Sequence, residues 1–197
     1  MGTQVGGYPL VQASQQANTV TGDMAGGNID KSTNYFGATN LTAMTRCIQE
    51  YAIEKAQDVQ VKSFIAALEH YMCQAVEGDI RDLEEKLAAA DRKDQLVAAR
   101  LRKHQASQFV LRHQSSPAAQ KIISFLLAKI LTCYENKVLP LVNAKASRVD
   151  IDSAIQTHVI ESAWDFLESN PLSIDHRMLT GFLYFLGGNC HLRWDPC

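Results

Sequence analysis

The fold is decided by an apolar stretch near the middle of the chain, SSPAAQKIISFLLAKILTCYENKVLP, residues 115–140. Ser116 followed by Pro117 is typical of a helix start, because the serine side chain caps free backbone N–H groups and proline fits the first turn. Isoleucine, leucine and phenylalanine then occur around most of the helix circumference. A helix that is apolar on nearly all sides is buried. The stretch therefore predicts the central helix of a bundle, ending at Pro140.

Helical patterns continue on both sides of this stretch. Apolar residues recur at spacings of three and four, which is typical of amphipathic helices. Such segments cover residues 41–52, 61–75, 150–167 and 173–186. A regular 3,4 repeat over residues 80–101 predicts an antiparallel helical hairpin or one long bundle helix. The predicted fold is all-α, a bundle of about five or six helices over residues 41–197.

Residues 1–40 differ in composition from the rest of the chain. They contain seven of the eleven glycines and only three charged side chains. Such a stretch is either disordered or built of short turns and strands. The piece VTGDMAGGNIDKST, residues 20–33, combines glycine turns with apolar anchors and favours a β-ribbon. Because an isolated two-stranded ribbon is marginally stable, we expect this appendage to lie on the helices or to serve docking or self-assembly.

The overall composition is that of an ordinary soluble globular protein. Apolar residues make up 46% and charged residues 20% of the 197 residues, and the net charge of -2 excludes a globally basic nucleic-acid binder. No apolar run approaches the ~20 residues of a transmembrane helix. The start, MGTQVGGYPL, lacks the basic and apolar regions of a secretory signal. Five widely spaced cysteines without CxxC argue against a disulfide framework. We therefore expect a cytoplasmic protein without membrane contact.

Charge is unevenly distributed within the helical region. No acidic residue occurs between Gln95 and Tyr134, which enclose six basic residues, and no lysine or arginine occurs between Val149 and His176, which enclose six acidic ones. The two segments either pack together, or solvate opposite surfaces, or steer contact with another protein or a second copy of the chain. The candidate partner or nucleic-acid contacts are Arg100, Arg102, Lys103 and Arg112.

The sequence offers no catalytic, cofactor-binding or metal-binding constellation. A GxSxG elbow, a Walker phosphate loop and an HExxH motif are all absent from it. Cys190, His191 and Cys197 could in principle meet around a metal, although ordinary hydrogen-bonded histidines are the simpler interpretation. We therefore assign no catalytic residue, no cofactor and no metal, and leave open whether the protein is an enzyme.

The C-terminal segment GGNCHLRW, residues 187–194, is dense in recognition chemistry. Its two glycines are expected to end the last helix. In an extended tail, alternate side chains lie on opposite sides. The inward set is Cys190, Leu192 and Trp194, and the outward set is His191 and Arg193. The tail either seals the core as a strap or anchors an interface, since Trp and Arg are frequent in binding hot spots. The predicted partner-binding residues are Asn189, His191, Arg193 and Trp194.

Two blocks of the sequence resemble blocks found in the ABC-three-component conflict systems of bacteria. YFLGGNCHLRWD, residues 184–195, looks like the C-terminal signature of their helical modules, and the resemblance is strongest over residues 118–197. The segment at residues 20–33 is similar to the short glycine-rich GD-x-x-GG-x-I segments that precede such regions in defence proteins. The two blocks occur in the order that the resemblance requires.

The resemblance implies a function in antiviral defence. In such systems, the helical module normally follows an effector domain, often a nuclease or protease. The module couples that effector to a small middle component and an ABC-type ATPase, which senses invading DNA. No effector domain precedes the helical region of this sequence, so the chain is either a fragment or a stand-alone adaptor. The resemblance thus implies a non-enzymatic adaptor in a bacterial anti-phage complex, whose partners are the ATPase and a middle-component or effector protein.

Two other functions stay open on the residues alone. One is a small hydrolytic or metal-dependent effector enzyme whose ligands are not recognisable from sequence. The other is a DNA-binding accessory protein that uses the basic stretch from Arg100 to Arg112. Duplex binding by such a stretch would weaken steeply with salt.

Overall fold

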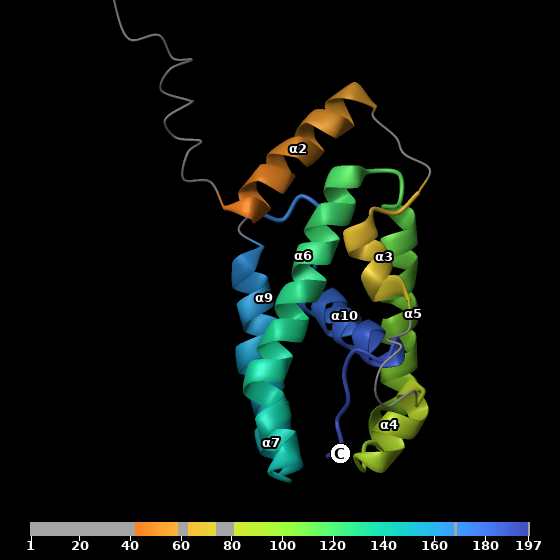
Figure 1. The fold of residues 1–197 in the computed structure, drawn as a ribbon, viewed down its shortest axis with the longest axis vertical. Helices are drawn as coiled ribbons and strands as arrows, with labels where there is room; N and C mark the ends of the chain where they lie inside the picture. The colour runs from red at the N-terminus through yellow and green to blue at the C-terminus, as the bar shows by residue number, and fades with distance from the viewer. Residues whose placement is uncertain (1–41, 59–62, 74–80, 168, 197) are drawn as a thin grey trace, which may run out of the picture. The chain divides into compact units, whose positions relative to one another are not determined.

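The computed structural model describes residues 42–58, 63–73, 81–167 and 169–196. The chain divides into two compact units, Met1–Asn40 and Leu41–Cys197, and the described residues all belong to the second. The β-ribbon predicted at residues 20–33 lies outside the described residues. Within the described ranges every regular element is a helix (Figure 1), which confirms the all-α prediction.

Seven continuous helical segments make up the described part of the chain, slightly more than predicted. They are α2 (Ala43–Gln57), α3 (Ala66–Met72), α4 (Leu83–Ala89), α5 (Leu96–Arg112), α6–η3–α7 (Pro117–Cys133, Tyr134–Val138 and Leu139–Asn143), α8–η4–α9 (Arg148–Ala154, Ile155–Ile160 and Glu161–Phe166) and α10 (His176–Gly188). The elements η3 and η4 are π-helical turns, and a 3₁₀ turn, η2 (Lys93–Gln95), precedes α5.

Helix α6 lies at the centre of the bundle, as predicted. Nine of its 17 residues are buried, and it contacts α2, α3, α9 and α10. Figure 1 shows it running along the bundle between α9 on one side and α3 and α5 on the other. The predicted start is also present: Ser116 Oγ accepts a hydrogen bond from the Ala119 backbone N–H at 3.1 Å, and Pro117 occupies the first turn.

Pro140 does not end this helix, contrary to the prediction. The π-helical turn Tyr134–Val138 precedes it, and Pro140 falls in the first turn of α7. A proline inside a helix removes one backbone hydrogen bond and its ring clashes with a carbonyl of the preceding turn, and the wider π-helical turn relieves both effects. The π-turn resets the hydrogen-bond register, so the helical segment continues to Asn143.

The 3,4 repeat over residues 80–101 does not form one long bundle helix, so that one of the two predicted alternatives is wrong. The chain breaks after α4, where Asp91 takes a left-handed φ of 54° and η2 follows. Leu87 on α4 is fully buried, whereas Val97 and Leu101 on α5 are 81% and 53% exposed. The break therefore turns the apolar positions of α4 and α5 in different directions and leaves those of α5 uncovered.

Helices α5 and α10 make the most extensive contact between any two of the described elements. A Cβ atom at Gly181 of α10 would lie 2.9 Å from the backbone carbonyl oxygen of Arg102 and 3.3 Å from Cβ of Ala106, both on α5. Glycine therefore permits the close approach of the two helix backbones. This contact sets the spacing between α5 and α10, the two helices that line the cleft described in the next subsection.

Candidate functional site

The C-terminal tail folds back over the core as a strap, which is one of the two roles predicted for it. Leu192 is 5% and Trp194 is 4% exposed. The Trp194 ring packs against Tyr134 and Tyr184 at centroid distances of 6.3 and 5.8 Å. Cys190 takes a left-handed φ of 64°, so the chain turns away from the axis of α10 at this residue. Residues 187–196 are called the C-terminal strap below.

The last helix ends at the two glycines as predicted, although they are its final two residues rather than residues past its end, and they provide room for packing. Both lie inside α10, and the left-handed residue that follows the helix is Cys190. A Cβ at Gly187 would lie 2.4 Å from Cη2 of Trp194, and one at Gly188 would lie 2.3 Å from Nζ of Lys103. Gly187 therefore leaves the space that the buried indole fills.

Polar contacts from α4 and its N-terminal flank hold the strap in place. Lys86 is 1% exposed, and its Nζ donates to the carbonyl oxygens of Gly187 and Leu192 at 2.9 and 3.1 Å. The Arg81 guanidinium donates to both carboxylate oxygens of Asp195 at 2.9 and 2.8 Å. Both hydrogen bonds come from the single nitrogen Nη2 of Arg81, and hydrogen bonds between charged groups are stronger than those between neutral ones. The strap is thus joined to the helical body at both of its ends.

Tyr134 of the π-turn η3 provides a third attachment. Its hydroxyl donates to the carbonyl oxygen of Arg193. Burial raises the pKa of Tyr134 well above the usual value for a phenol, so the hydroxyl keeps the proton that it donates. The central helix, α4 and α10 are therefore all connected through the strap.

The residues predicted as partner contacts make contacts within the chain. Asn189 Nδ2 donates to the carbonyl oxygen of Tyr71 on α3 at 2.9 Å. The Arg193 guanidinium lies 3.4 Å from Oδ1 of Asn143, at the end of α7. The structure does not bring the predicted residues together on one surface, since Trp194 is in the core. Their part in partner binding stays a prediction.

His191 lies in a cluster of rings with His70 and Tyr71 of α3. The ring centroids are 5.4 Å from His70 and 5.7 Å from Tyr71. Its buried Nε2 has no hydrogen-bond partner among the described residues. Burial and, to a smaller extent, the neighbouring His70 lower the pKa of His191 below its usual value. The side chain is half-buried, so it does not face freely outward as the tail pattern predicted.

We expect acid to destabilise the protein through His191. Because folding lowers the pKa of His191, the unfolded chain takes up the proton first, and the free energy of unfolding decreases as the pH falls through about 6.5. His113, whose pKa burial also lowers, acts in the same direction. Melting temperatures measured between about pH 7.5 and about pH 5.5 test this expectation. His191→Gln should flatten the pH dependence, and equal flattening by His158→Gln, at an exposed position of η4, would contradict it.

The basic residues predicted on α5 do not share one surface. Arg100 pairs with Glu84, Arg102 is half-buried, and the side chain of Lys103 lies over Gly188. Arg112 is exposed at the end of the helix and has no ion pair within the described residues. In that same part of the chain, no ion pair joins residues 96–133 to the acidic residues 150–175, so the two charged segments do not neutralise each other.

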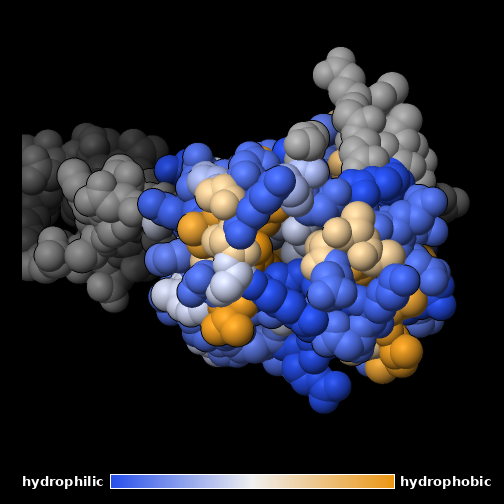
Figure 2. Space-filling model, turned by 90° about the horizontal axis from the view of Figure 1, so that it is seen from below, coloured by the Kyte–Doolittle hydropathy of each residue, from blue (hydrophilic) through white to orange (hydrophobic). Residues whose placement is uncertain are grey.

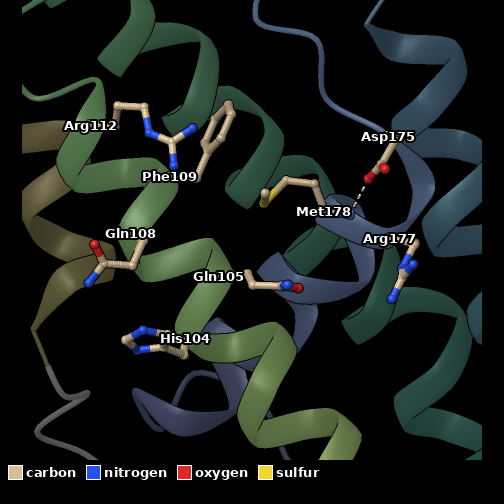
Figure 3. A pocket seen from close by; sticks show the side chains of 8 residues that line it. All are labelled: His104, Gln105, Gln108, Phe109, Arg112, Asp175, Arg177 and Met178. Carbon is tan, nitrogen blue, oxygen red and sulfur yellow. Dashed lines mark hydrogen bonds between the residues drawn. The ribbon is translucent and has the colours of Figure 1, made fainter.

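A cleft of about 420 Å³ opens beside Arg112, between α5 and the first turn of α10 (Figure 3). Its lining residues are His104, Gln105, Gln108, Phe109 and Arg112 on α5, with Asp175, Arg177 and Met178 at the start of α10. The Asp175 carboxylate caps α10, because its Oδ1 accepts from the Met178 backbone N–H at 2.7 Å. The other polar groups of the lining are two guanidiniums, two amides and an imidazole. This donor-rich set suits a carboxylate.

Sequence reasoning missed the α10 wall of this cleft. Arg177 and Met178 are far from Arg112 in the sequence, and no local pattern indicates that they meet. Figure 3 shows Gln105 and Met178 extending from the two helices toward the space between them. The small residues Gly181 and Ala106 are the signal that could have paired α5 with α10, because small residues permit close helix contacts.

A second hollow, of about 300 Å³, lies at the end of the bundle where α4 and α7 finish, next to Trp194. Its arginines are already paired: Arg92, which is 2% exposed, with Asp152, and Arg148 with Asp94. Figure 2 shows this end, where the apolar areas are separated by hydrophilic surface. The cleft between α5 and α10 offers more uncommitted donors and is the better candidate for binding.

The family model for C-terminal domain 9 of the ABC-three component (ABC-3C) systems matches residues 82–194, more than half of the chain. The chain belongs to this family. The membership confirms the resemblance seen in the segment at residues 184–195. The segment at residues 20–33 lies outside the match. No protein of curated function and no solved structure matches the chain.

The match to C-terminal domain 9 begins and ends at recognisable structural features. The match begins at Asp82, whose carboxylate caps α4 by accepting from the Glu85 backbone N–H at 2.8 Å, and ends at Trp194 in the strap. It contains both walls of the cleft, whereas α2 and α3 precede it. The cleft and most of the strap are therefore parts of the family domain.

Two further observations concern possible metal ligands and the length of the helices. Within the described ranges, no group of three or more His, Cys, Asp and Glu side chains is placed to hold a metal ion. In that part of the chain, the helices are too short or too polar to span a membrane.

Proposed function

We propose that this protein is a non-enzymatic interaction module that couples the ABC-type ATPase of its defence system to an effector. Its family links it to a system of several components, and such a system needs contacts between proteins. The proposal includes direct binding to the ATPase, the middle component or the effector, in the cytoplasm. It does not require chemistry from the chain itself.

One observation carries the proposal: α5 exposes aliphatic side chains beside a donor-rich cleft. Val97, Leu101 and Leu111 are the exposed aliphatic residues of the helix. Single exposed apolar residues are common, but several on one helix beside a concave site are typical of a surface that binds protein. The acid-free composition of α5 and α6 adds a positive charge bias that would favour an acidic partner.

The strap has a supporting part in this proposal. Asn189, His191, Arg193 and Trp194 attach the end of α10 to α3, α7 and the core. Because the first turn of α10 lines the cleft, attachments at the other end of this helix would limit its movement relative to α5. In this way, the residues predicted as partner contacts would act on binding through position rather than through direct contact.

The experiment that tests the proposal measures assembly. The full chain is co-expressed with the products of its neighbouring genes, and the molar mass of the purified material is determined by light scattering. We expect a stable complex that contains the ABC-type ATPase or the middle component. A chain that stays alone with every neighbour would contradict the proposal.

The same preparation distinguishes the alternative functions. Duplex DNA binding that falls steeply with salt, in the absence of a protein complex, would favour a DNA-binding accessory. Stoichiometric bound metal together with hydrolysis would favour an effector enzyme. The basic residues of α5 do not favour DNA binding, because they are dispersed: Arg100 is paired with Glu84, and Lys103 lies over Gly188.

A further inference from the structure

Among the described residues, none covers one face of α5 along most of its length. The exposed residues of this face, which recur at spacings of three and four, are Val97, Leu101, His104, Gln105, Gln108, Leu111 and Arg112. The opposite face is buried through Ala99, Ala106 and Val110. At 1.5 Å per residue, the open face extends over about 20 Å, or four helical turns. This length suits another helix better than it suits a small molecule.

The chemistry of the open face also suits a helix. Its ends are aliphatic, with Leu111 42% exposed at the cleft end, and its middle carries the amides of Gln105 and Gln108. An amphipathic helix binds such a surface through apolar residues spaced by three and four. The exposed valine and leucines would gain nothing from phosphate groups, so nucleic acid fits the face poorly.

The cleft adds a charge requirement for the occupant. Arg112 from α5 and Arg177 from α10 line it, and no described carboxylate pairs with either guanidinium. The one carboxylate in the lining, that of Asp175, is engaged in capping α10. Two guanidiniums on one cleft favour a carboxylate partner through charge-assisted hydrogen bonds. The residues from Leu96 to Cys133 contribute no opposing negative charge.

We infer that the open face of α5 and the adjoining cleft bind an acidic amphipathic helix from another protein component of the system. Its apolar residues pack on Val97, Leu101 and Leu111, and a carboxylate enters the cleft between Arg112 and Arg177. This inference rests on the proposed function, since it names the surface and the chemistry of the contact. The bound helix lies along α5 and touches the first turn of α10.

Photo-crosslinking tests the location and the identity of the occupant. A photo-reactive amino acid is placed at Gln105 or Gln108 of the full chain, or at Gln49 on α2 as a control, in cells that carry the whole gene cluster. We expect crosslinks from the two α5 positions, and none from Gln49, to a segment rich in Asp and Glu with apolar residues at helical spacing. Crosslinks to a second copy of this chain, or to DNA, would overturn the inference.

Substitutions test the chemistry with matched controls. Leu101→Asp, and the pair Arg112→Glu with Arg177→Glu, should each weaken binding of the co-purifying component by at least about tenfold. Val149→Asp, at an even more exposed aliphatic position on α8, and Arg46→Glu, at an exposed arginine on α2, should change it by less than about twofold. All the positions are exposed, so circular dichroism should show unchanged helix content.

The outcomes separate this inference from the proposed function. If the complex forms and the α5 variants bind as tightly as the controls, the docking surface is wrong and the adaptor function stands. If no complex forms with any component, both are wrong. Loss of binding that is confined to the α5 and cleft variants would support both.

Discussion

Replacing Trp194 with alanine should lower the free energy of unfolding by about 3–5 kcal/mol, the usual range for removal of a large buried aromatic side chain. The indole is 4% exposed, packs on Tyr134 and Tyr184, and fills the space beside Gly187. Its loss would leave a cavity at the point where the strap joins the core. Denaturant titration followed by circular dichroism measures the change.

The other tryptophan of the chain provides the control. Trp164 is 38% exposed and stacks on His176 at 4.4 Å. Because water already reaches much of its ring, Trp164→Ala should cost only about 1 kcal/mol. Equal losses for the two alanine variants would mean that the strap does not seal the core.

Gly187→Ala should cost about 1–3 kcal/mol, although alanine is ordinarily the better helix former. The new methyl group would lie 2.4 Å from Cη2 and 2.6 Å from Cζ3 of Trp194, so the indole or the end of α10 would have to move. Thermal unfolding of the purified variant measures the cost. A Gly187→Ala variant as stable as the wild type would show that the indole is free to move.

Two further variants isolate the cause of this effect. In the Trp194→Ala background the clash is absent, so Gly187→Ala should become neutral or stabilise the protein by up to about 1 kcal/mol. Gly188→Ala is the matched single variant: its methyl group would meet the end of the Lys103 side chain, which can swing away. Its cost should therefore be well below that of Gly187→Ala.

The individual helices of this protein are predictable because their signals are local. Ser116 and Pro117 mark the start of α6, and its apolar circumference marks it as central. Burial of Trp194 follows from its alternation with polar residues in the tail. Pro140 misled the prediction because a π-turn has no evident sequence signature. The repeat over residues 80–101 left a hairpin and one long helix both open, because periodicity alone does not show where the chain changes direction.

The candidate site is less predictable because it depends on contacts between distant segments. Arg112 stands out by its place in an acid-free stretch, whereas Arg177 is an isolated cation after an acidic stretch and carries no comparable signal. Only the packing of α10 on α5 brings both to one cleft. His191 also depends on a contact between distant segments. Its position in the tail predicts exposure, but the rings of His70 and Tyr71 on α3 lie against one side of it.

The contact at Gly181 has a mechanical consequence. At Gly181 the backbone of α10 lies directly against α5 with no side chain of its own between them, and well-packed interiors transmit strain with little loss. A push or twist applied to α5 is then passed directly to α10 and, through the strap, to α4 and the central helix. In the proposed complex, a partner bound to α5 would therefore move the helical domain as a unit.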